Sequence, residues 1–324
     1  MKSFQAAMSS ILLLTASVLA NAQAAAPSAV VVHPANQSRN LLNTEYLAAA
    51  QAGRRIVAVG EHGTVALSDD SGKTWHQAHS VPTSAELTDV YFVDANNGWA
   101  VGHWGTILKT TDGGNNWTSL RSDTQVDQPL FSVRFLNSND GFAVGLWSLM
   151  LKTNDGGATW NTVHLPVPEG AKRADRNLFS IFSASGEPLF ITAERGLIYR
   201  SNDNGTTWDP IASGYSGSLW CGTVLANGTI LVGGLRGSVY RSLDKGATWS
   251  RIDSGTTSSI TSLVQLPNHV VIGTALDGIV ITSEDGGSTF KMRQDKDRQA
   301  YTSAVSLKNG RQLLVGSHGL QVFN

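Results

Sequence analysis

The eight residues "TNDGGATW" (153–160) decide the fold, because the same pattern recurs along the whole chain. Further copies are "SDDSGKTW" (68–75), "TTDGGNNW" (110–117), "SNDNGTTW" (201–208), "SLDKGATW" (242–249) and "SEDGGSTF" (283–290). The third residue of each box is an aspartate: Asp70, Asp112, Asp155, Asp203, Asp244 and Asp285. The eighth is aromatic: Trp75, Trp117, Trp160, Trp208, Trp249 and Phe290. Successive aspartates lie 42, 43, 48, 41 and 41 residues apart, a period that four short strands and their turns consume, so the spacing predicts propeller blades.

Two further registers predict seven blades rather than six. A glycine, once replaced by serine, opens a short alternating segment before each box, as in "GTILKT" (105–110), and the last copy is "GLQVFN" (319–324). An apolar residue opens a β-rich run at seven positions, which we expect to be the innermost strands: Tyr46, Leu87, Leu130, Leu178, Leu219, Ile260 and Tyr301. The predicted fold is all-β, a seven-bladed propeller with four-stranded antiparallel blades.

The domain boundaries follow from the same registers. We expect a signal peptide over 1–24 and one propeller over 27–324, with blades at about 45–80, 86–122, 129–165, 177–213, 218–253, 259–293 and 300–324. The seventh copy stops where its box would begin. The β-branched segment "AVVVHP" (29–34) is predicted to supply the missing outer strand, closing the ring with both chain ends.

The N-terminus has the composition of a secretory signal. Lys2 precedes the apolar "MSSILLLTASVLA" (8–20), and "ANAQA" (20–24) offers small-residue cleavage positions. An uncleaved membrane anchor is the alternative. The prediction is a periplasmic or secreted protein.

Charge and cysteine content exclude several classes of function. The net charge of −1 and pI near 6.7 supply no positive field for nucleic acid. The single Cys221 excludes an intramolecular disulfide.

The boxes are interpreted as structural staples. Each lies in a predicted turn between the third and outer strands, where the aspartate accepts backbone N–H groups, glycine takes a positive φ and the aromatic ring packs between sheets. Calcium binding is the alternative, but the ligand set of a helix–loop–helix site is incomplete. No metal and no cofactor is predicted.

Longer units carry a family resemblance. The stretches "DVYFVDANNGWAVGHWGTILKTTDGGNNW" (89–117) and "SVRFLNSNDGFAVGLWSLMLKTNDGGATW" (132–160) resemble the photosystem II stability and assembly factor-like propellers, within the Asp-box or bacterial neuraminidase repeat superfamily. The resemblance implies an exported, seven-bladed, non-enzymatic protein with an arginine-rich surface that contacts a membrane-protein client. It also implies a location in the thylakoid lumen if the host is photosynthetic.

Sialidases resemble the chain only in the boxes. The early Arg-Ile-Pro motif of those enzymes is missing. Tyr46 and Tyr301 have no carboxylate partner in the repeat register, although a partner from another blade stays possible. The prediction is a protein that is not an enzyme, with a glycosidase as the alternative.

The residues before the repeated glycine are the candidate binding rim. This position changes from blade to blade, which is typical of a binding surface, although neutral variation of turn tips explains it equally well. The seven residues are His62, Trp104, Trp147, Arg195, Arg236, Asp277 and His318. The longer connection "LPVPEGAKRADRN" (165–177) adds Lys172, Arg173 and Arg176, so we expect a basic patch there, unless it is only a solvated loop. His62, His103 and His318 form an alternative zinc set.

These observations predict a binding or assembly factor for an envelope membrane-protein complex, monomeric, acting through the face opposite the boxes. Nucleic acid is not an expected partner. The alternative is a secreted carbohydrate-binding or glycoside-hydrolysing protein, with Trp104 and Trp147 stacking on sugar rings. A scaffold with no specific ligand is the third possibility.

Overall fold

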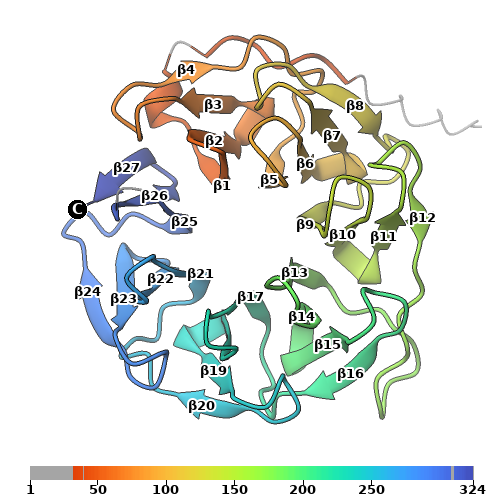
Figure 1. Ribbon diagram of the computed structural model, residues 1–324, viewed down its shortest axis with the longest axis vertical. Coiled ribbons are helices and arrows are strands. Elements are labelled where there is room, and N and C mark those ends of the chain that lie inside the picture. The colour runs from red at the N-terminus through yellow and green to blue at the C-terminus, as the bar shows by residue number, and fades with distance from the viewer. Residues whose placement is uncertain (1–31, 39, 308–309, 324) are drawn as a thin grey trace, which may run out of the picture.

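The computed structural model describes residues 32–38, 40–307 and 310–323. In this part of the chain, seven antiparallel sheets stand around a central opening like the blades of a propeller (Figure 1). Six sheets have four strands, and the sheet at the C-terminal end has three. The predicted all-β, seven-bladed architecture is confirmed.

Each blade runs from an inner strand at the opening to an outer strand at the periphery. Blades 1 and 2 contain β1 (Tyr46–Ala52), β2 (Arg55–Gly60), β3 (Val65–Ser68), β4 (His76–Gln77), and β5 (Leu87–Phe92), β6 (Gly98–Gly102), β7 (Ile107–Thr110), β8 (Thr118–Arg121). Blades 3 and 4 contain β9 (Leu130–Phe135), β10 (Gly141–Gly145), β11 (Met150–Thr153), β12 (Asn161–Thr162), and β13 (Leu178–Phe182), β14 (Leu189–Ala193), β15 (Leu197–Ser201), β16 (Asp209–Ala212). Blades 5 and 6 contain β17 (Leu219–Val224), β18 (Ile230–Gly234), β19 (Val239–Ser242), β20 (Ser250–Ile252), and β21 (Ile260–Gln265), β22 (Val271–Ala275), β23 (Ile279–Ser283), β24 (Lys291–Gln294). Blade 7 contains β25 (Tyr301–Ser306), β26 (Gln312–Gly316) and β27 (Gly319–Phe323).

Six short 3-10 turns complete the secondary structure that is described. They are η1 (Leu41–Asn43), η2 (Glu61–Gly63), η3 (His103–Gly105), η4 (Leu146–Ser148), η5 (Glu194–Gly196) and η6 (Leu235–Gly237). Five of them, η2 to η6, join the second and third strands of a blade.

The seven inner strands begin at the seven residues expected from the sequence, from Tyr46 in β1 to Tyr301 in β25, so that prediction is confirmed. Each inner strand also carries an irregularity in register directly after its first residue; Leu130 and Ser132, for example, pair with successive residues of β10. The second residue is therefore left out of the ladder in every blade.

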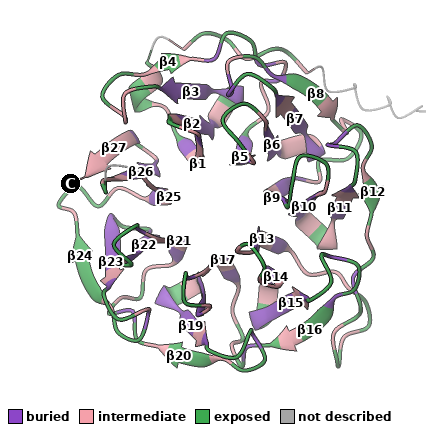
Figure 2. Ribbon diagram, in the orientation of Figure 1, coloured by how far each residue is buried: buried purple, intermediate pink, exposed green. Residues whose placement is uncertain are grey.

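The core lies between the blades rather than within them. Seven apolar clusters each combine residues of two neighbouring blades, one cluster for every interface around the ring. Between blades 2 and 3, the rings of Trp99 and Phe135 stack with centroids 3.5 Å apart. Figure 2 shows the second strands almost wholly buried and the outer strands largely exposed. A single blade cannot bury both faces of its sheet, so each blade depends on its two neighbours for stability.

Packing between the first and last blades closes the ring. The Thr302 hydroxyl on β25 donates a hydrogen bond to the Tyr46 carbonyl on β1 at 2.8 Å, and the Gln51 amide on β1 donates to the Ser306 carbonyl at 2.9 Å. An apolar cluster joins Tyr46 and Ile56 of blade 1 to residues of blade 7.

The predicted closure by an N-terminal strand is wrong for the residues that can be assessed. Of the segment 29–34, residues 29–31 lie outside the described part of the chain, and residues 32–34 belong to no strand. The chain that follows lies against blade 1, where the Ala35 N–H donates to the Val81 carbonyl at 3.0 Å. The turn η1, rather than a strand, packs against β27. β-branched composition gives a segment strand propensity, but it does not choose the sheet edge that the segment pairs with.

The boxes form tight hydrogen-bonded turns. In blade 3, Thr153 Oγ1 donates to Asp155 Oδ1 at 2.7 Å, and the Thr159 N–H and hydroxyl donate to the two carboxylate oxygens at 2.9 and 2.6 Å. Gly157 adopts a φ of 91° and donates its N–H to the Thr153 hydroxyl. Trp160 packs into the cluster between blades 2 and 3. The other five boxes make equivalent bonds, with the Asn116 amide in place of the threonine hydroxyl in blade 2. Each box therefore ties a turn and anchors one aromatic ring between two blades.

The antiparallel order places the boxes and the rim on opposite faces. The turns that join the third and outer strands carry the boxes, and the Gly113 N–H of one box donates to Asn96 in the turn between the first two strands. The turns between the second and third strands lie at the other ends of the strands, beside the connections between blades; the Asp123 N–H of one connection donates to the Trp104 carbonyl at 2.7 Å. We call this second side of the ring the tip face.

Candidate partner-binding surface

The turns on the tip face hold non-glycine residues in the left-handed region. In blade 1, the Thr64 N–H donates to the Glu61 carbonyl at 3.0 Å across His62 and Gly63, and both central residues have positive φ. This is a type I′ hairpin turn, whose first central position favours asparagine, aspartate or glycine. The residues found there are His62, Trp104, Trp147, Arg195, Arg236 and Asp277, with φ between 52° and 57°. The seventh candidate, His318, is not among the positive-φ residues.

Placing bulky residues in this conformation costs stability. A left-handed conformation costs an L-residue about 1–2 kcal/mol, and such outliers concentrate at functional sites. Trp147 is 59% exposed, so its ring recovers little of this cost by packing against the protein. Arg195 and Arg236 are exposed as well, whereas Trp104 is half-buried.

Asn177 links the tips of blades 3 and 4. Its side-chain oxygen accepts a hydrogen bond from the Trp147 N–H at 2.9 Å, and its amide nitrogen donates to Glu194 Oε1 at 2.9 Å. The Asn177 N–H also donates to Glu194 Oε2 at 3.2 Å. Because Glu194 directly precedes Arg195, the exposed Trp147 and Arg195 are positioned by one shared residue.

The long connection between blades 3 and 4 joins the same network. The Arg176 carbonyl accepts hydrogen bonds from the Ser148 N–H and hydroxyl at 2.8 and 3.0 Å. A cavity of about 520 Å³ opens beside it, lined by Gly170, Ala171, Lys172, Arg173, Asp175, Arg176 and Arg195. Four of these seven residues are cationic and one is acidic, so the lining of the cavity carries net positive charge.

One acid offsets part of this charge. Arg173 Nε lies 2.8 Å from Asp175 Oδ2, although the Arg173 side chain stays 81% exposed. The Arg173 hydrogen bond is the main cause of the lowered pKa of Asp175. Lys172, Arg176 and Arg195 form no ion pair within the described part of the chain.

The structure thus brings together five of the nine residues predicted to bind a partner: Trp147, Lys172, Arg173, Arg176 and Arg195. Arg236 occupies the next tip along the ring, on blade 5, where its N–H lies 3.3 Å from Ser259 Oγ. Trp104, His62 and His318 belong to the tips of blades 2, 1 and 7, outside the lining of the cationic cavity. The Trp104 N–H donates to Asp127 Oδ1 at 3.0 Å, and the amide of the neighbouring Gln128 donates to the Leu146 carbonyl, beside Trp147, at 2.9 Å. The sequence analysis did not single out Asn177 or Glu194. Their positions could have indicated a role, because Asn177 directly precedes the inner strand β13 and Glu194 directly precedes the rim residue Arg195.

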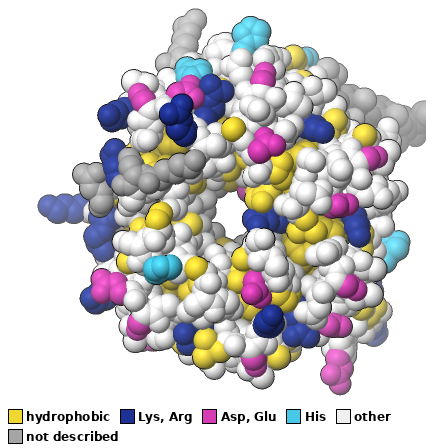
Figure 3. All heavy atoms as spheres, in the orientation of Figure 1, with side chains coloured by type: hydrophobic (Ala, Val, Ile, Leu, Met, Phe, Trp, Pro, Cys, Tyr) yellow, Lys and Arg dark blue, Asp and Glu magenta, His cyan; other side chains and the backbone are white. Residues whose placement is uncertain are grey.

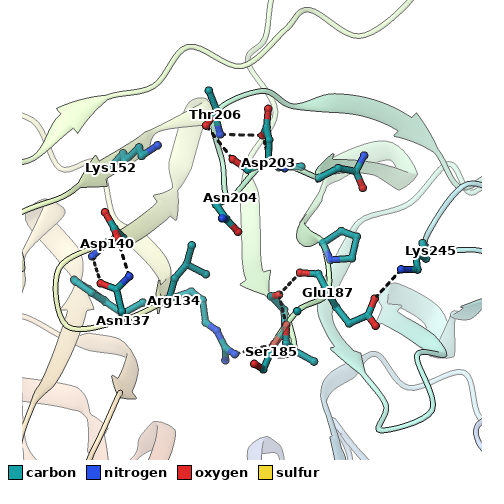
Figure 4. Close-up of a pocket in the computed structure, with 18 of the residues that line it drawn as sticks. Arg134, Asn137, Asp140, Lys152, Ser185, Glu187, Asp203, Asn204, Thr206 and Lys245 are labelled. Carbon is teal, nitrogen blue, oxygen red and sulfur yellow. Dashed lines mark hydrogen bonds and ion pairs between the residues drawn. The ribbon is translucent and has the colours of Figure 1, made fainter.

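A second cavity lies on the opposite face, among the turns that carry the boxes. It measures about 940 Å³ and is lined by Arg134, Asp140, Glu187, Asp203 and neighbouring residues. Figure 4 shows its carboxylates facing partners of their own: Asp140 accepts from the Asn137 amide at 2.7 Å, and Glu187 lies 3.8 Å from Lys245. Asp203 is engaged in its box. These carboxylates therefore have structural roles in the cavity.

The face of the ring drawn in Figure 3 carries mixed charge. Figure 3 shows an open centre, with acidic and basic side chains scattered around the visible face and no broad patch of either sign. Within the described ranges, no cluster of three or more potential metal-ligating side chains occurs, and no helix is long and apolar enough to span a membrane.

Comparison with models of protein families shows the family of this chain. A family model described as "Photosynthesis system II assembly factor YCF48" matches residues 77–272, more than half of the chain. The chain belongs to this family. The matched region includes the Asn177 network and the basic cavity. No curated protein sequence matches the chain significantly.

Solved structures agree on the fold. A YCF48 bound to a D1 peptide is 18% identical, covers 89% of this chain and 94% of its own, and superposes with a TM-score of 0.70. YCF48 from Cyanidioschyzon merolae is 17% identical over 89% and 97% of the two chains, also at 0.70. An ancestral GH74 enzyme is 14% identical, with a TM-score of 0.69, but 91% of this chain corresponds to only 46% of that enzyme. At these identities the similarity shows the propeller fold alone.

Proposed function

We propose that this protein is an exported, non-catalytic accessory factor that binds a protein segment of an envelope membrane complex during its assembly. The binding surface is the tip face of blades 3 and 4, formed by Trp147, Lys172, Arg173, Arg176 and Arg195, and extended by Arg236 on blade 5. The observation that carries the proposal is the Asn177 network, which presents an exposed tryptophan and an exposed arginine beside a cationic cavity.

The chemistry of this surface suits a protein partner. Tryptophan and arginine are the residue types most enriched among the strongest contacts of protein interfaces. Arginine forks bind carboxylates with two parallel hydrogen bonds, so acidic side chains of a partner fit the cavity. The related YCF48 bound to a D1 peptide supports the proposal by analogy, since the peptide binding is a property of that relative.

The candidate catalytic groups favour a non-catalytic role. Tyr301 is the only one of the two singled-out tyrosines with a carboxylate partner: its hydroxyl donates to Asp295, from the connection between blades 6 and 7. Burial first, and this hydrogen bond second, raise the Tyr301 pKa, which is the opposite of what an activated nucleophile needs. Burial also raises the pKa of the Cys221 thiol to about 12.

Site-specific photocrosslinking in intact cells tests the proposal. A photoreactive phenylalanine analogue placed at Trp147 or Arg195 is expected to capture one and the same membrane protein. The matched control is Leu243, which is 70% exposed on the box face. Capture of the same proteins from Leu243, or of nothing from Trp147 and Arg195, would contradict the proposed surface.

Charge reversal provides the second arm. The variant Arg173→Glu/Arg176→Glu/Arg195→Glu is expected to lose the crosslinked product and to lower the amount of assembled complex in the membrane. Lys73→Glu/Lys245→Glu reverses charge on the box face and is expected to retain both. A glycan array on the wild-type protein tests the carbohydrate alternative: binding abolished by Trp147→Ala would favour that alternative instead.

Export is tested separately, because residues 1–31 lie outside the described part of the chain. Cell fractionation is expected to place the protein outside the cytoplasm, with a mature N-terminus near Ala22 or Ala24 on Edman sequencing. Recovery of the full-length chain in the cytoplasm would contradict the proposed localisation.

A further inference from the structure

The residue type at the second position of each inner strand differs between two groups of blades. This is the residue that the strand ladder leaves unpaired in every blade. Around the ring it is Leu47, Thr88, Phe131, Phe179, Trp220, Thr261 and Thr302. Blades 2, 6 and 7 therefore carry threonine here, whereas blades 3, 4 and 5 carry three aromatic residues in succession.

The threonines show what a structural residue does at this position. Thr88 Oγ1 donates to the Leu130 carbonyl of the next blade at 2.6 Å, and Thr302 Oγ1 donates to the Tyr46 carbonyl at 2.8 Å. Thr261 makes the equivalent bond to Tyr301 at 2.8 Å. Each hydroxyl ties the start of one inner strand to the start of the next.

Phe131, Phe179 and Trp220 lack a hydroxyl and make no such tie. All three residues are half-buried, and their strands β9, β13 and β17 are the innermost of their blades, beside the central opening (Figure 1). The rings of Phe131 and Phe179 lie against each other, with centroids 5.9 Å apart and an angle of 16° between planes. By contrast, Phe135 of the same strand is almost fully buried against Trp99. The three aromatic residues thus expose apolar surface where a threonine would add a bond.

These aromatic residues lie at the tip-face end of their strands. Leu130, next to Phe131, pairs with Gly145, which directly precedes the Trp147 tip turn. In the same way, Leu178 pairs with Ala193 beside the Arg195 turn, and Leu219 pairs with Gly234 beside the Arg236 turn. The half-buried aromatic ring and the exposed tip residue of each blade therefore belong to one end of that blade.

We propose that Phe131, Phe179 and Trp220 form an aromatic floor at the mouth of the central opening, which receives an aromatic or large apolar side chain from an acidic segment of the partner. This inference rests on the proposed function, because Arg195 and Arg236 belong to the tips of blades 4 and 5, at the same ends of those blades as Phe179 and Trp220. Arg176, Arg195 and Arg236 form no ion pair within the described residues, so they are available to carboxylates that flank the inserted side chain. An apolar anchor within a rim of charge pairs is the usual anatomy of a tight protein contact.

Two synthetic peptides test the inference. Both are blocked at each end and contain a run of glutamates; one has a central tryptophan and the other an alanine in its place. In calorimetric titrations the wild-type protein is expected to bind the tryptophan peptide about tenfold more tightly, a difference of about 1.4 kcal/mol. The variant Phe131→Thr/Phe179→Thr/Trp220→Thr is expected to bind both peptides equally, with the affinity that the wild type has for the alanine peptide.

The variants are chosen so that folding does not confuse the result. Threonine is the residue that blades 2, 6 and 7 carry at this position, and each single substitution is expected to remove part of the tenfold preference if the triple variant is unstable. Leu47→Thr changes the same position on blade 1 and is expected to keep the full preference. A preference for tryptophan that survives in the triple variant, or that is absent from the wild type, would overturn the aromatic floor.

Failure of the floor is distinguishable from failure of the proposed function. The variant Arg173→Glu/Arg176→Glu/Arg195→Glu is expected to weaken binding of both peptides while leaving the aromatic residues in place. Crosslinking from Trp147 could be lost on charge reversal but kept in the triple threonine variant. This result would support the tip face as the binding surface and would reject the aromatic floor.

Discussion

The side-chain oxygen of Asn177 accepts a hydrogen bond from the backbone N–H of Trp147 at 2.9 Å, although 30 residues separate them in the chain. This bond crosses from blade 3 to blade 4 on the tip face. Since Asn177 also holds Glu194, a single side chain sets the relative position of two exposed rim residues. The candidate binding surface is therefore built by contacts between neighbouring blades.

Removing the Asn177 side chain should loosen the rim without unfolding the ring. Asn177→Ala leaves the Trp147 N–H and the Glu194 carboxylate without this partner, and we expect a loss of about 1–2 kcal/mol in unfolding free energy. Amide hydrogen exchange should accelerate at residues 146–148 and 194–196. Asn202→Ala, at an exposed position on the box face, is the control and should change neither. Unchanged exchange at both tips in Asn177→Ala would refute this role.

Relieving the left-handed strain at Trp147 should stabilise the protein and impair its binding. Asparagine adopts the φ of 52° at this position more readily, and the exposed tryptophan ring contributes little packing. We expect Trp147→Asn to raise the unfolding free energy by about 0.5–1 kcal/mol and to weaken capture of the membrane partner. The control Leu243→Asn also replaces an exposed apolar residue by asparagine, but on the box face and at a position without a positive φ. It should leave stability unchanged. A destabilised Trp147→Asn would show that the ring has a packing role.

The boxes should make the protein sensitive to acid. Hydrogen bonds from a threonine and from backbone N–H groups lower the pKa of Asp70, Asp155 and Asp244 from 3.8 to about 2, and they also lower the pKa of Asp203 and Asp285. A depressed folded-state pKa stabilises the fold above the unfolded value, and this stabilisation is lost as pH falls toward the folded value. The urea concentration at the midpoint of unfolding should therefore decrease as the pH is lowered from about 4 to about 2.

A single box variant isolates the effect. Asp155→Asn is expected to lower the urea midpoint near neutral pH and to reduce the acid dependence, because one of the shifted carboxylates is gone. Asp209→Asn changes an exposed aspartate outside the boxes and serves as the control. If the urea midpoint of Asp155→Asn decreased with pH as much as that of the wild type, groups other than Asp155 would cause the acid sensitivity.

Truncation of two aromatic residues of β9 should lower stability by very different amounts. Phe135 is 1% exposed and stacks on Trp99, so Phe135→Ala should cost about 3–5 kcal/mol of unfolding free energy. Phe131→Thr removes a half-buried ring and restores the threonine found in other blades, so its cost should be about 1 kcal/mol or less. Urea denaturation of the two variants measures the difference. Equal losses would place Phe131 in the core and weaken its assignment to the aromatic floor.

Much of the architecture could be predicted from the sequence because it is encoded locally. The boxes and the strands that precede them repeat within about forty residues, so their spacing predicts the number of blades and the first residue of every inner strand. Hydrogen bonds of the box, such as those between Thr153, Asp155 and Thr159, join residues within six positions of one another. Periodicity of this kind survives in a single sequence.

The sequence analysis did not single out Phe131, Phe179 and Trp220, because their exposure is not encoded in the repeat. Apolar residues in an inner strand are expected to be core, and their exposure depends on the irregular register after the first residue of the strand. Residues 32–34 of the segment 29–34 were also misassigned, since strand propensity does not specify a sheet edge.

The sequence by itself determined the repeating unit, its number of copies and the opposite placement of boxes and tips, since each depends on turns and ladders between neighbours in the chain. Only the tertiary structure decided which tips cooperate and how the ring closes. Asn177 binds the tip of the preceding blade, and η1 packs on β27 after the chain has travelled around the ring. Such contacts join residues that the repeat keeps far apart, and the geometry of the closed ring alone brings them together.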